Sequence, residues 1–226
     1  KIKNKYAEIL FEKRKRRGIT MQEATDLMRS RNYFGSAMLE TGDADAMISG
    51  LTRNYRDTIR PALQVIGTDD DVDKIAGMYI LFTKKGPFFF ADTTVNENPS
   101  AEDIVHITTL TAKVIERLKI TPRIALLSYS NFGSSEGPDP IKMREATRML
   151  HDQHPNLIVD GEIQANFALN KELRNEIFPF SELAKKNTNT LIFPNLSSGN
   201  IAYKLMQEMG GTESIGPILL GMKKPV

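Results

Sequence analysis

Short apolar runs of strand length alternate with longer amphipathic stretches over most of the chain. A run of about four to eight apolar residues is typical of a buried strand, whereas apolar residues recurring every three or four positions indicate a helix. Strands separated by helices predict βαβ units, in which helices cover both faces of a mostly parallel sheet. Strands are predicted at residues 43–50, 74–83, 123–129, 157–163 and 190–196, and helices at residues 6–17, 57–65, 98–118, 140–151 and 201–209.

Two places carry clear local signals. The Gly86-Pro87 dipeptide follows the apolar run at residues 74–83 and precedes a second run, "FFFA" at residues 88–91, which predicts a β-hairpin. Ser100 stands at the position from which its side chain can cap the following helix. These signals fix the connections around the centre of the predicted sheet.

Composition sets broad limits on function. The 226 residues suffice for one large domain or two small ones, and the 40% hydrophobic and 26% charged residues are typical of a soluble globular protein. The absence of cysteine from this sequence excludes disulfides, cysteine–zinc sites and thiol catalysis within it. No apolar run approaches the roughly 20 residues that span a membrane. We therefore expect a cytoplasmic protein with no membrane or nucleic-acid partner.

The basic run "KRKRR" at residues 13–17 ends the first predicted helix. Its simplest interpretation is a solvated helix end, because such charge runs usually face water. The alternative is a patch that binds an anion or nucleic acid. The net charge of +2 favours no particular class of partner.

Polar loops follow the predicted strands at the places where ligands bind in parallel sheets, namely the carboxyl ends of the strands. The loop at residues 128–135, "SYSNFGSS", includes Ser128, Ser130, Gly133 and Ser134 and precedes a helix. Hydroxyls and free backbone N–H groups at such a position suit a phosphate or carboxylate. The alternative is an ordinary capped turn between a strand and a helix.

Two further strand ends are polar. Asp160 and Glu162 follow one predicted strand, and could serve in acid–base chemistry, bind a cation, or accept backbone hydrogen bonds that brace the chain. Asn195, Gly199 and Asn200 follow another, at the start of a helix. The convergence of three polar strand ends on one edge predicts a site for a small anionic molecule.

Several ordered motifs resemble the phosphate acetyltransferase/butyryltransferase family over essentially the whole length. They include "YFGSAMLETGDADAMISG", "RPALQVIGT", "ALLSYSNFGSS", "LIVDGEIQ" and "IFPNLSSGNIAYKLMQ". Within that family, "FTKKGPFFFADTTVN", "SYSNFGSSEGPDP" and "DGEIQANFALN" look most like the carboxy-terminal, phosphotransacetylase-like domain of the large bacterial NADP-dependent malic enzymes.

The resemblance implies an α/β, two-lobed architecture related to isocitrate and isopropylmalate dehydrogenases, with a cleft between the lobes. On that basis residues 1–73 and 216–226 form the first lobe, and residues 74–215 form the second. The family's opening βα units have no counterpart in this sequence. The first lobe is therefore expected to be incomplete, and the chain to be a fragment of a longer polypeptide.

The resemblance also implies chemistry. Family members transfer an acetyl group between coenzyme A and inorganic phosphate without a covalent enzyme intermediate. Arg60, in "TIRPALQ", matches an arginine in the family's cleft, and the loop at residues 128–135 matches its anion-binding loop. The predicted ligand-binding residues are Arg60, Ser128, Ser130, Gly133, Ser134, Asp160, Asn195, Gly199 and Asn200.

Two departures from the family pattern bear on activity. Many members carry a basic residue in the anion-binding loop, where this sequence has Asn131 and Phe132. The chain ends at Val226, before the position of the Ser-Arg pair of active enzymes. Loss of a donor that stabilises transition-state charge lowers rates by roughly 10²- to 10³-fold. These departures predict a domain with no catalytic residues of its own. No metal site is expected either, because the three histidines show no metal-ligand spacing.

The resulting hypothesis is a non-catalytic module of a malic enzyme that binds acetyl-CoA as an inhibitor and supports homo-oligomerisation. The amino-terminal malic enzyme domain of the same chain would oxidise and decarboxylate malate, using NADP and a divalent metal (Mg or Mn). The alternative is an active phosphate acetyltransferase, which converts acetyl-CoA and phosphate to acetyl phosphate and coenzyme A. A third possibility is a purely structural dimerisation domain.

Overall fold

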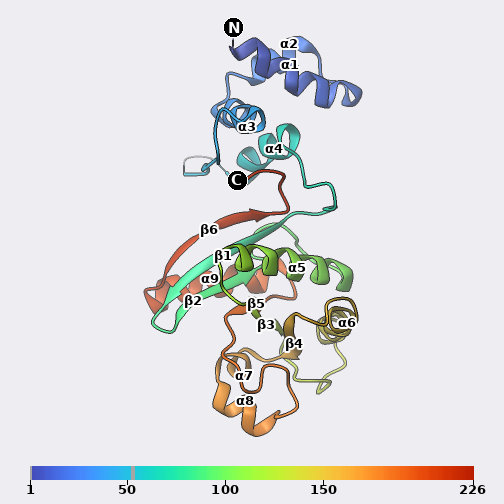
Figure 1. Ribbon diagram of the computed structural model, residues 1–226, viewed down its shortest axis with the longest axis vertical. Helices are drawn as coiled ribbons and strands as arrows, with labels where there is room; N and C mark the ends of the chain where they lie inside the picture. Colours follow the sequence, from blue (N-terminus) through green and yellow to red (C-terminus); the bar gives the residue numbers. More distant parts are fainter. Residues whose placement is uncertain (1, 52–53) are drawn as a thin grey trace. The chain divides into compact units, whose positions relative to one another are not determined.

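The computed structural model describes residues 2–51 and 54–226, which form two compact units (Figure 1). The first unit comprises Lys1–Ile75 with Gly221–Val226, and the second comprises Ala76–Leu220. The predicted lobe boundaries lay at residues 73/74 and 215/216. Residues 216–220 lie in the second unit because they continue strand β6 (Glu213–Leu220), which pairs with strand β1 (Ala76–Thr83).

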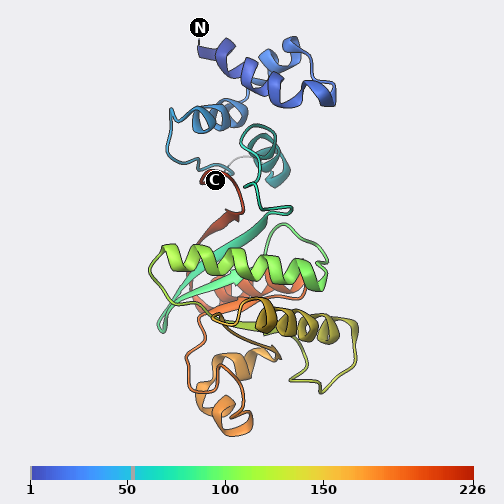
Figure 2. The same ribbon diagram turned by 45° about the vertical axis from the view of Figure 1, so that its right-hand side comes forward.

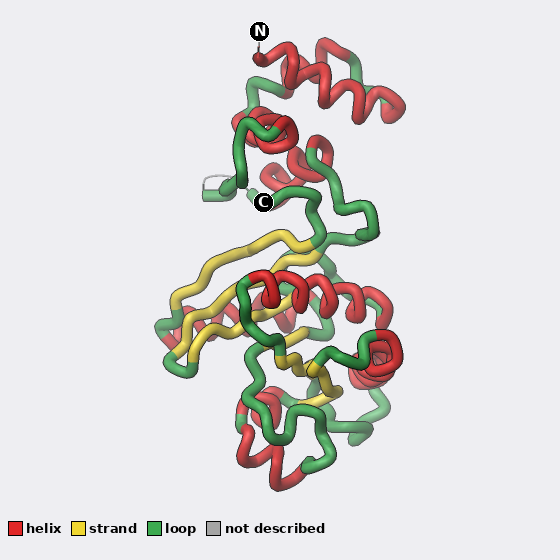
Figure 3. The backbone as a smooth tube through the Cα atoms, viewed as in Figure 1, coloured by secondary structure: helices red, strands yellow, loops and turns green. Residues whose placement is uncertain are grey.

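The first unit is helical in its described part (Figure 3). Its core consists of apolar side chains from several helices, including Tyr6, Leu10, Met28 and Tyr33. Its elements are α1 (Ile2–Arg14), the short 3-10 helix η1 (Lys15–Arg17), α2 (Met21–Leu27), α3 (Arg31–Thr41) and α4 (Tyr55–Val65).

The predicted strand at residues 43–50 is wrong. These residues adopt no regular structure, and Ile48 is fully exposed. A strand needs a partner for its backbone, and no strand of the described residues pairs with this stretch. Within this stretch, the Met47 N–H donates a backbone hydrogen bond to the Pro225 carbonyl near the end of the chain.

The described part of the second unit contains one six-stranded sheet in the order β4-β3-β5-β2-β1-β6. The pairs β4–β3, β3–β5 and β5–β2 are parallel, and β1 is antiparallel to both of its neighbours. The predicted mixed α/β, mostly parallel sheet is therefore confirmed. The remaining strands are β2 (Gly86–Ala91), β3 (Arg123–Leu127), β4 (Ile158–Ile163) and β5 (Thr190–Ile192).

Helices lie on both faces of this sheet. Figures 1 and 2 show α5 and α6 on one face and α9 on the other, while α7 and α8 lie beyond the β4 side. None of the described helices is long and apolar enough to cross a bilayer. The bounds are α5 (Ala101–Arg117), α6 (Pro138–Gln153), α7 (Ala165–Leu169), α8 (Lys171–Ile177) and α9 (Leu196–Gly210).

Local signals in the sequence account for the central connections. The predicted hairpin is confirmed, since β1 and β2 are antiparallel partners joined at Thr83 and Gly86. Ser100 caps α5 as predicted, and the Ser100 and Asp103 side chains each accept a hydrogen bond from the other residue's backbone N–H.

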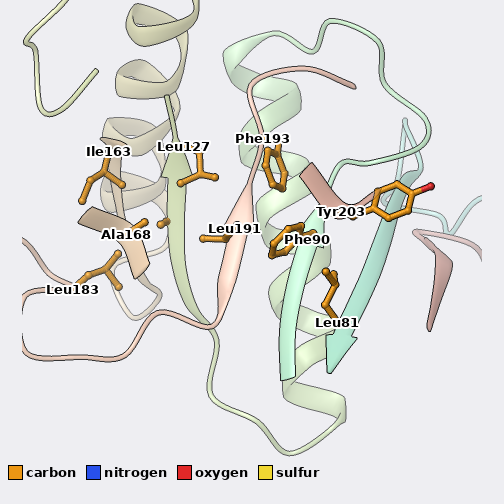
Figure 4. Close-up of a cluster of buried hydrophobic side chains, with 10 residues drawn as sticks. Leu81, Phe90, Leu127, Ile163, Ala168, Leu183, Leu191, Phe193 and Tyr203 are labelled. Atoms are coloured by element: carbon orange, nitrogen blue, oxygen red, sulfur yellow. The ribbon is translucent and has the colours of Figure 1, made fainter. Parts of the chain in front are cut away.

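A cluster of buried apolar side chains fills the space along one face of the sheet (Figure 4). Phe90 and Leu191 come from neighbouring parallel strands, and Tyr203 comes from α9. Tyr203 also stacks on Tyr79 with ring centroids 4.1 Å apart. This packing fixes the strands whose carboxyl ends form the site described next.

Candidate functional site

The loops after four parallel strands meet at one edge of the sheet. The Gln164 N–H, just after β4, donates to Oδ1 of Asn131 in the loop after β3, at 2.8 Å. The side-chain amide of Asn200, in α9 after β5, donates to the carbonyl of Thr93 after β2, at 3.2 Å. The loops that follow neighbouring strands are therefore in direct contact.

The loop at residues 128–135 is organised around one buried carboxylate. Oε1 of Glu162 accepts hydrogen bonds from the Ser130 hydroxyl at 2.8 Å and from the Gly133 N–H at 2.9 Å. The Ser134 hydroxyl lies 3.0 Å from that of Ser130 and accepts a bond of 2.9 Å from the Asn131 N–H. Ser130 is fully buried, whereas Gly133 and Ser134 are exposed. Hydrogen bonds within the loop and to Glu162 of β4 therefore hold the loop in shape.

Arg144 of α6 supports the same carboxylate. Its Nε lies 3.2 Å from Oε2 of Glu162, and its Nη2 donates to the Ser135 carbonyl at 2.9 Å. Burial opposes ionisation of Glu162, but hydrogen bonds from Arg144, Gly133 and Ser130 outweigh it and lower the pKa of this carboxyl. Glu162 braces the loop, which was one of the alternatives open from the sequence. The role of Arg144 was missed.

Asp160 supports a different segment. It is 7% exposed and accepts hydrogen bonds from the Ser181 hydroxyl at 2.7 Å and from the Glu182 N–H at 2.9 Å. Its other bond comes from the adjacent Gly161 N–H. Among the hydrogen bonds of the described residues, none joins Asp160 to the loop at residues 128–135. Its predicted contact with a ligand stays a prediction.

The first turn of α9 packs closely against the loop after β2. Oδ1 of Asn195 accepts from the Ser198 N–H at 3.0 Å and so caps the helix, which begins five residues earlier than predicted. A Cβ atom on Gly199 would lie 2.5 Å from the carbonyl oxygen of Asp92. Gly199 therefore permits a contact between the helix and the strand end that a larger residue would prevent.

Asp92, which is not among the predicted site residues, shapes the loop at residues 92–96. Its carboxylate is 2% exposed and accepts hydrogen bonds from the backbone N–H groups of Gly77, Thr94, Val95 and Asn96 at 2.8 to 3.1 Å. The signal in the sequence was an acidic residue followed by two threonines directly after an apolar run. Such a residue can satisfy the backbone of the turn that follows it.

Arg60 lies in α4 of the first unit, whereas the other predicted site residues belong to the second unit. Together with Arg14, Arg17 and Tyr33 it lines a cavity of about 620 Å³, which we call the arginine cavity. Burial raises the pKa of Tyr33, although the charges of Arg60 and Arg14 act in the opposite direction. Arg14 and Arg17 of the basic run line this cavity, and residues 15–17 are exposed to solvent.

Within the described ranges, no group of three or more histidine or acidic side chains could hold a metal ion. The charged features at hand are instead the arginine cavity and the hydroxyl- and amide-rich loops at the sheet edge. Guanidinium groups, hydroxyls and backbone N–H groups are donors to anions. The arginine cavity belongs to the first unit, and the loops at the sheet edge belong to the second.

Comparison with known proteins gives the family. The sequence profile described as "Phosphate acetyl/butaryl transferase" matches residues 1–226. A solved phosphotransacetylase from Streptococcus pyogenes is 36% identical and superposes with a TM-score of 0.87, covering 100% of this chain and 67% of that one. The chain belongs to the phosphate acetyl/butyryl transferase family, as the motifs indicated.

Relatives include enzymes of different lengths. The phosphate acetyltransferase of Nitratidesulfovibrio vulgaris is 36% identical over 99% of this chain and 32% of its own length. The phosphate acetyltransferase of Bacillus subtilis is 35% identical over 96% of this chain and 67% of its own length. The NADP-dependent malic enzyme of Escherichia coli is 38% identical, with 96% of this chain and 29% of that protein covered. The chain thus spans about a third of the first curated relatives it matches.

These comparisons correct the functional hypothesis. Malic enzymes are among the relatives, but whole phosphate acetyltransferases and a solved phosphotransacetylase match at comparable identity over nearly the entire chain. The hypothesis of a non-catalytic malic enzyme module is therefore wrong, and the findings favour the alternative of a phosphate acetyltransferase. The oxidoreductase activity, NADP and allosteric inhibition attached to that hypothesis are left without support.

Proposed function

We propose that this chain is part of an enzyme that transfers an acetyl group between coenzyme A and inorganic phosphate. The observation that carries the proposal is the polar edge of the sheet in a chain that matches the phosphotransacetylase family along its whole length. The half-buried Ser128 and the exposed Ser134 offer hydroxyl donors at that edge. Such donors suit the phosphate substrate.

The reaction requires a phosphate oxygen to attack the carbonyl carbon of the acetyl thioester. The C–S bond then breaks, the sulfur departs as a thiolate that takes up a proton, and acetyl phosphate forms. The protein's task is to hold two anionic substrates in line and to stabilise negative charge on the carbonyl oxygen. We assign Ser128 and Ser134 to phosphate binding, and Ser130 to positioning the loop through Glu162.

The arginine cavity supplies a site for the coenzyme. Coenzyme A carries several phosphate groups, and Arg14, Arg17 and Arg60 present three guanidinium groups around one cavity, whose lining also includes Glu23 and Asp26. Guanidinium binds phosphate through paired, charge-assisted hydrogen bonds. We assign the cavity to these phosphates.

The finer prediction of a fold like that of isocitrate and isopropylmalate dehydrogenases belongs to the same proposal, as do a cytoplasmic location and homo-oligomerisation.

Steady-state assays of variants test the assignment of the loop. Acetyl-CoA and phosphate are supplied, and acetyl phosphate is trapped as the hydroxamate. Ser134→Ala and Ser128→Ala should each lower kcat/KM for phosphate, by up to about a hundredfold. Ser214→Ala, on the edge strand β6, is the control and should leave the rate unchanged. Equal rates for all three variants and the unaltered protein would refute the assignment.

A further inference from the structure

A second cavity lies at the opposite end of the sheet, next to the residues where β2, β3 and β5 begin. It has a volume of about 570 Å³, and we call it the basal cavity. Pro87 is the second residue of β2, Arg123 is the first residue of β3, and Asn189 immediately precedes β5. The side chains that matter here are Lys85, Arg123, Lys171, Glu172, Arg174 and Thr188.

The lining of the basal cavity is strongly cationic. Among the described residues that line it, four carry positive charge (Lys85, Arg123, Lys171 and Arg174) and only Glu172 carries negative charge. Arg123 makes hydrogen bonds to the backbone carbonyls of Asn187 and Thr121, which leave its charge unneutralised. A cavity with such an excess of positive charge attracts anions.

Arg174 contributes a charge that is completely shielded from solvent. Its side chain is 0% exposed, and its guanidinium donates to the carbonyls of Phe167, Ala168, Leu183 and Lys186. In the described part of the chain it makes no ion pair within 4 Å. Carbonyl oxygens satisfy its donors, while the carboxylates of Asp160 and Glu172 interact with its charge from beyond ion-pair distance.

Thr188 provides an independent observation. Its residue is 6% exposed, and its Oγ1 has no hydrogen-bond partner in the described structure. Buried hydroxyl groups almost always have a partner. Because Thr188 lines the basal cavity, an acceptor atom bound there is a candidate partner for this hydroxyl.

We propose that the basal cavity binds a small dianion, either a phosphate or a short dicarboxylate. Lys85, Lys171 and Arg123 supply charge at the cavity wall, Arg174 adds a buried charge, and the Thr188 hydroxyl donates a hydrogen bond. The site is distinct from the loops at the carboxyl edge, and it requires no acetyl transfer. Its existence therefore does not depend on the function proposed above.

Nuclear magnetic resonance titration of the backbone amides tests this site. Inorganic phosphate and succinate are added separately, and the Thr188 and Asn187 signals report on the basal cavity. The signals of Gly133 and Ser134 report separately on the loop at the carboxyl edge. We expect saturable shifts at Thr188 and Asn187 with at least one of the two dianions, and the dianion that acts identifies the ligand class.

Variants make the result specific. Lys171→Gln and Thr188→Val should each weaken the dianion's apparent affinity at Thr188 or its neighbour Asn187 by about tenfold. Lys185→Gln, an exposed lysine outside the lining, should leave it unchanged. Lys171→Gln keeps the test decisive if Thr188→Val folds poorly. Absence of saturation with both dianions, or equal affinity in the unaltered protein and Lys171→Gln, would overturn the proposal.

Discussion

The Ser130 hydroxyl donates a hydrogen bond of 2.8 Å to Oε1 of Glu162, and both side chains are fully buried. The same oxygen accepts from the Gly133 N–H, so a single carboxylate holds two points of the loop at residues 128–135. Arg144 balances the charge of that carboxylate. The loop is therefore preorganised by the protein before any ligand arrives, which is the condition for effective electrostatic stabilisation.

Replacing Glu162 with glutamine should loosen this arrangement. Glu162→Gln retains the size of the side chain but removes its charge, leaving Arg144 with the exposed Glu136 as its ion-pair partner. We expect unfolding free energy at pH 7 to fall by about 2 kcal/mol, since hydrogen bonds to charged groups contribute about 1.5–3 kcal/mol. Urea unfolding measures the change. Glu145→Gln, on the exposed side of α6, is the matched control and should leave stability unchanged.

The same carboxylate predicts a dependence of stability on pH. The pKa of Glu162 is lowered below its ordinary value of 4.5 in the folded protein. The stabilisation from ionised Glu162 is therefore present above pH 4.5 and is lost as the pH falls through the lowered, folded-state pKa. The stability difference between the unaltered protein and Glu162→Gln should shrink on acidification below pH 4.5. A difference that stays constant down to acid-induced unfolding would contradict this role.

Arg174 should be essential to the segment between β4 and β5. Lysine cannot reproduce the planar fork with which Arg174 reaches the carbonyls of Phe167, Leu183 and Lys186. We expect Arg174→Lys to lower unfolding free energy by about 3 kcal/mol, because several buried carbonyls lose their donors. Urea unfolding and limited proteolysis would report the change. The surface variant Arg148→Lys should behave like the unaltered protein, and equal stability of both variants would disprove the expectation.

Gly199 is expected to tolerate no side chain. A Cβ atom at this position would lie 2.5 Å from the Asp92 carbonyl oxygen, so Gly199→Ala should force α9 away from the loop after β2. Overpacking of this kind costs about 1–3 kcal/mol, measurable as a lower urea midpoint. In Gly35→Ala the nearest added contact is 3.7 Å, so that helical variant should be neutral or slightly stabilised. A neutral Gly199→Ala would show that this contact is loose.

Arg60 gives a prediction about coenzyme binding. Removal of one guanidinium from the arginine cavity should raise KM for acetyl-CoA by roughly ten- to a hundredfold, with a smaller effect on kcat. Steady-state kinetics of Arg60→Gln would show this split. Arg29→Gln is the control, since the Arg29 side chain is 76% exposed. An unchanged KM for Arg60→Gln would argue against coenzyme binding in the arginine cavity.

Periodicity and capping signals predicted the central part of the fold. The β1–β2 hairpin and the Ser100 cap of α5 follow from local sequence, because turns and helix ends depend on nearby residues. Strand β6 was not predicted, since its pairing with β1 joins residues far apart in the chain. The false strand at residues 43–50 failed for the same reason, as a short apolar run does not reveal whether a partner exists.

The candidate site, like the fold, could be predicted from the sequence only in part. Polar residues at the ends of neighbouring strands were predicted from the sequence. Hydrogen bonds connect those ends in two places, from Gln164 to Asn131 and from Asn200 to Thr93. The sequence could not assign Glu162 to the loop, because that depends on contacts over 29 and 32 positions in the chain. Nor could a charge run show that Arg14 and Arg17 line a cavity with Arg60. Long-range packing decides these relationships.

Phosphorus nuclear magnetic resonance of the purified protein with acetyl-CoA and inorganic phosphate tests acetyl transfer most directly. We expect a growing acetyl phosphate signal matched by release of free coenzyme A thiol, and the reverse reaction from acetyl phosphate and coenzyme A. Ser134→Ala should slow both directions in parallel, because one site serves both. Binding of acetyl-CoA would contradict the proposed function if no acetyl phosphate formed from it and no acetyl-CoA formed from acetyl phosphate and coenzyme A.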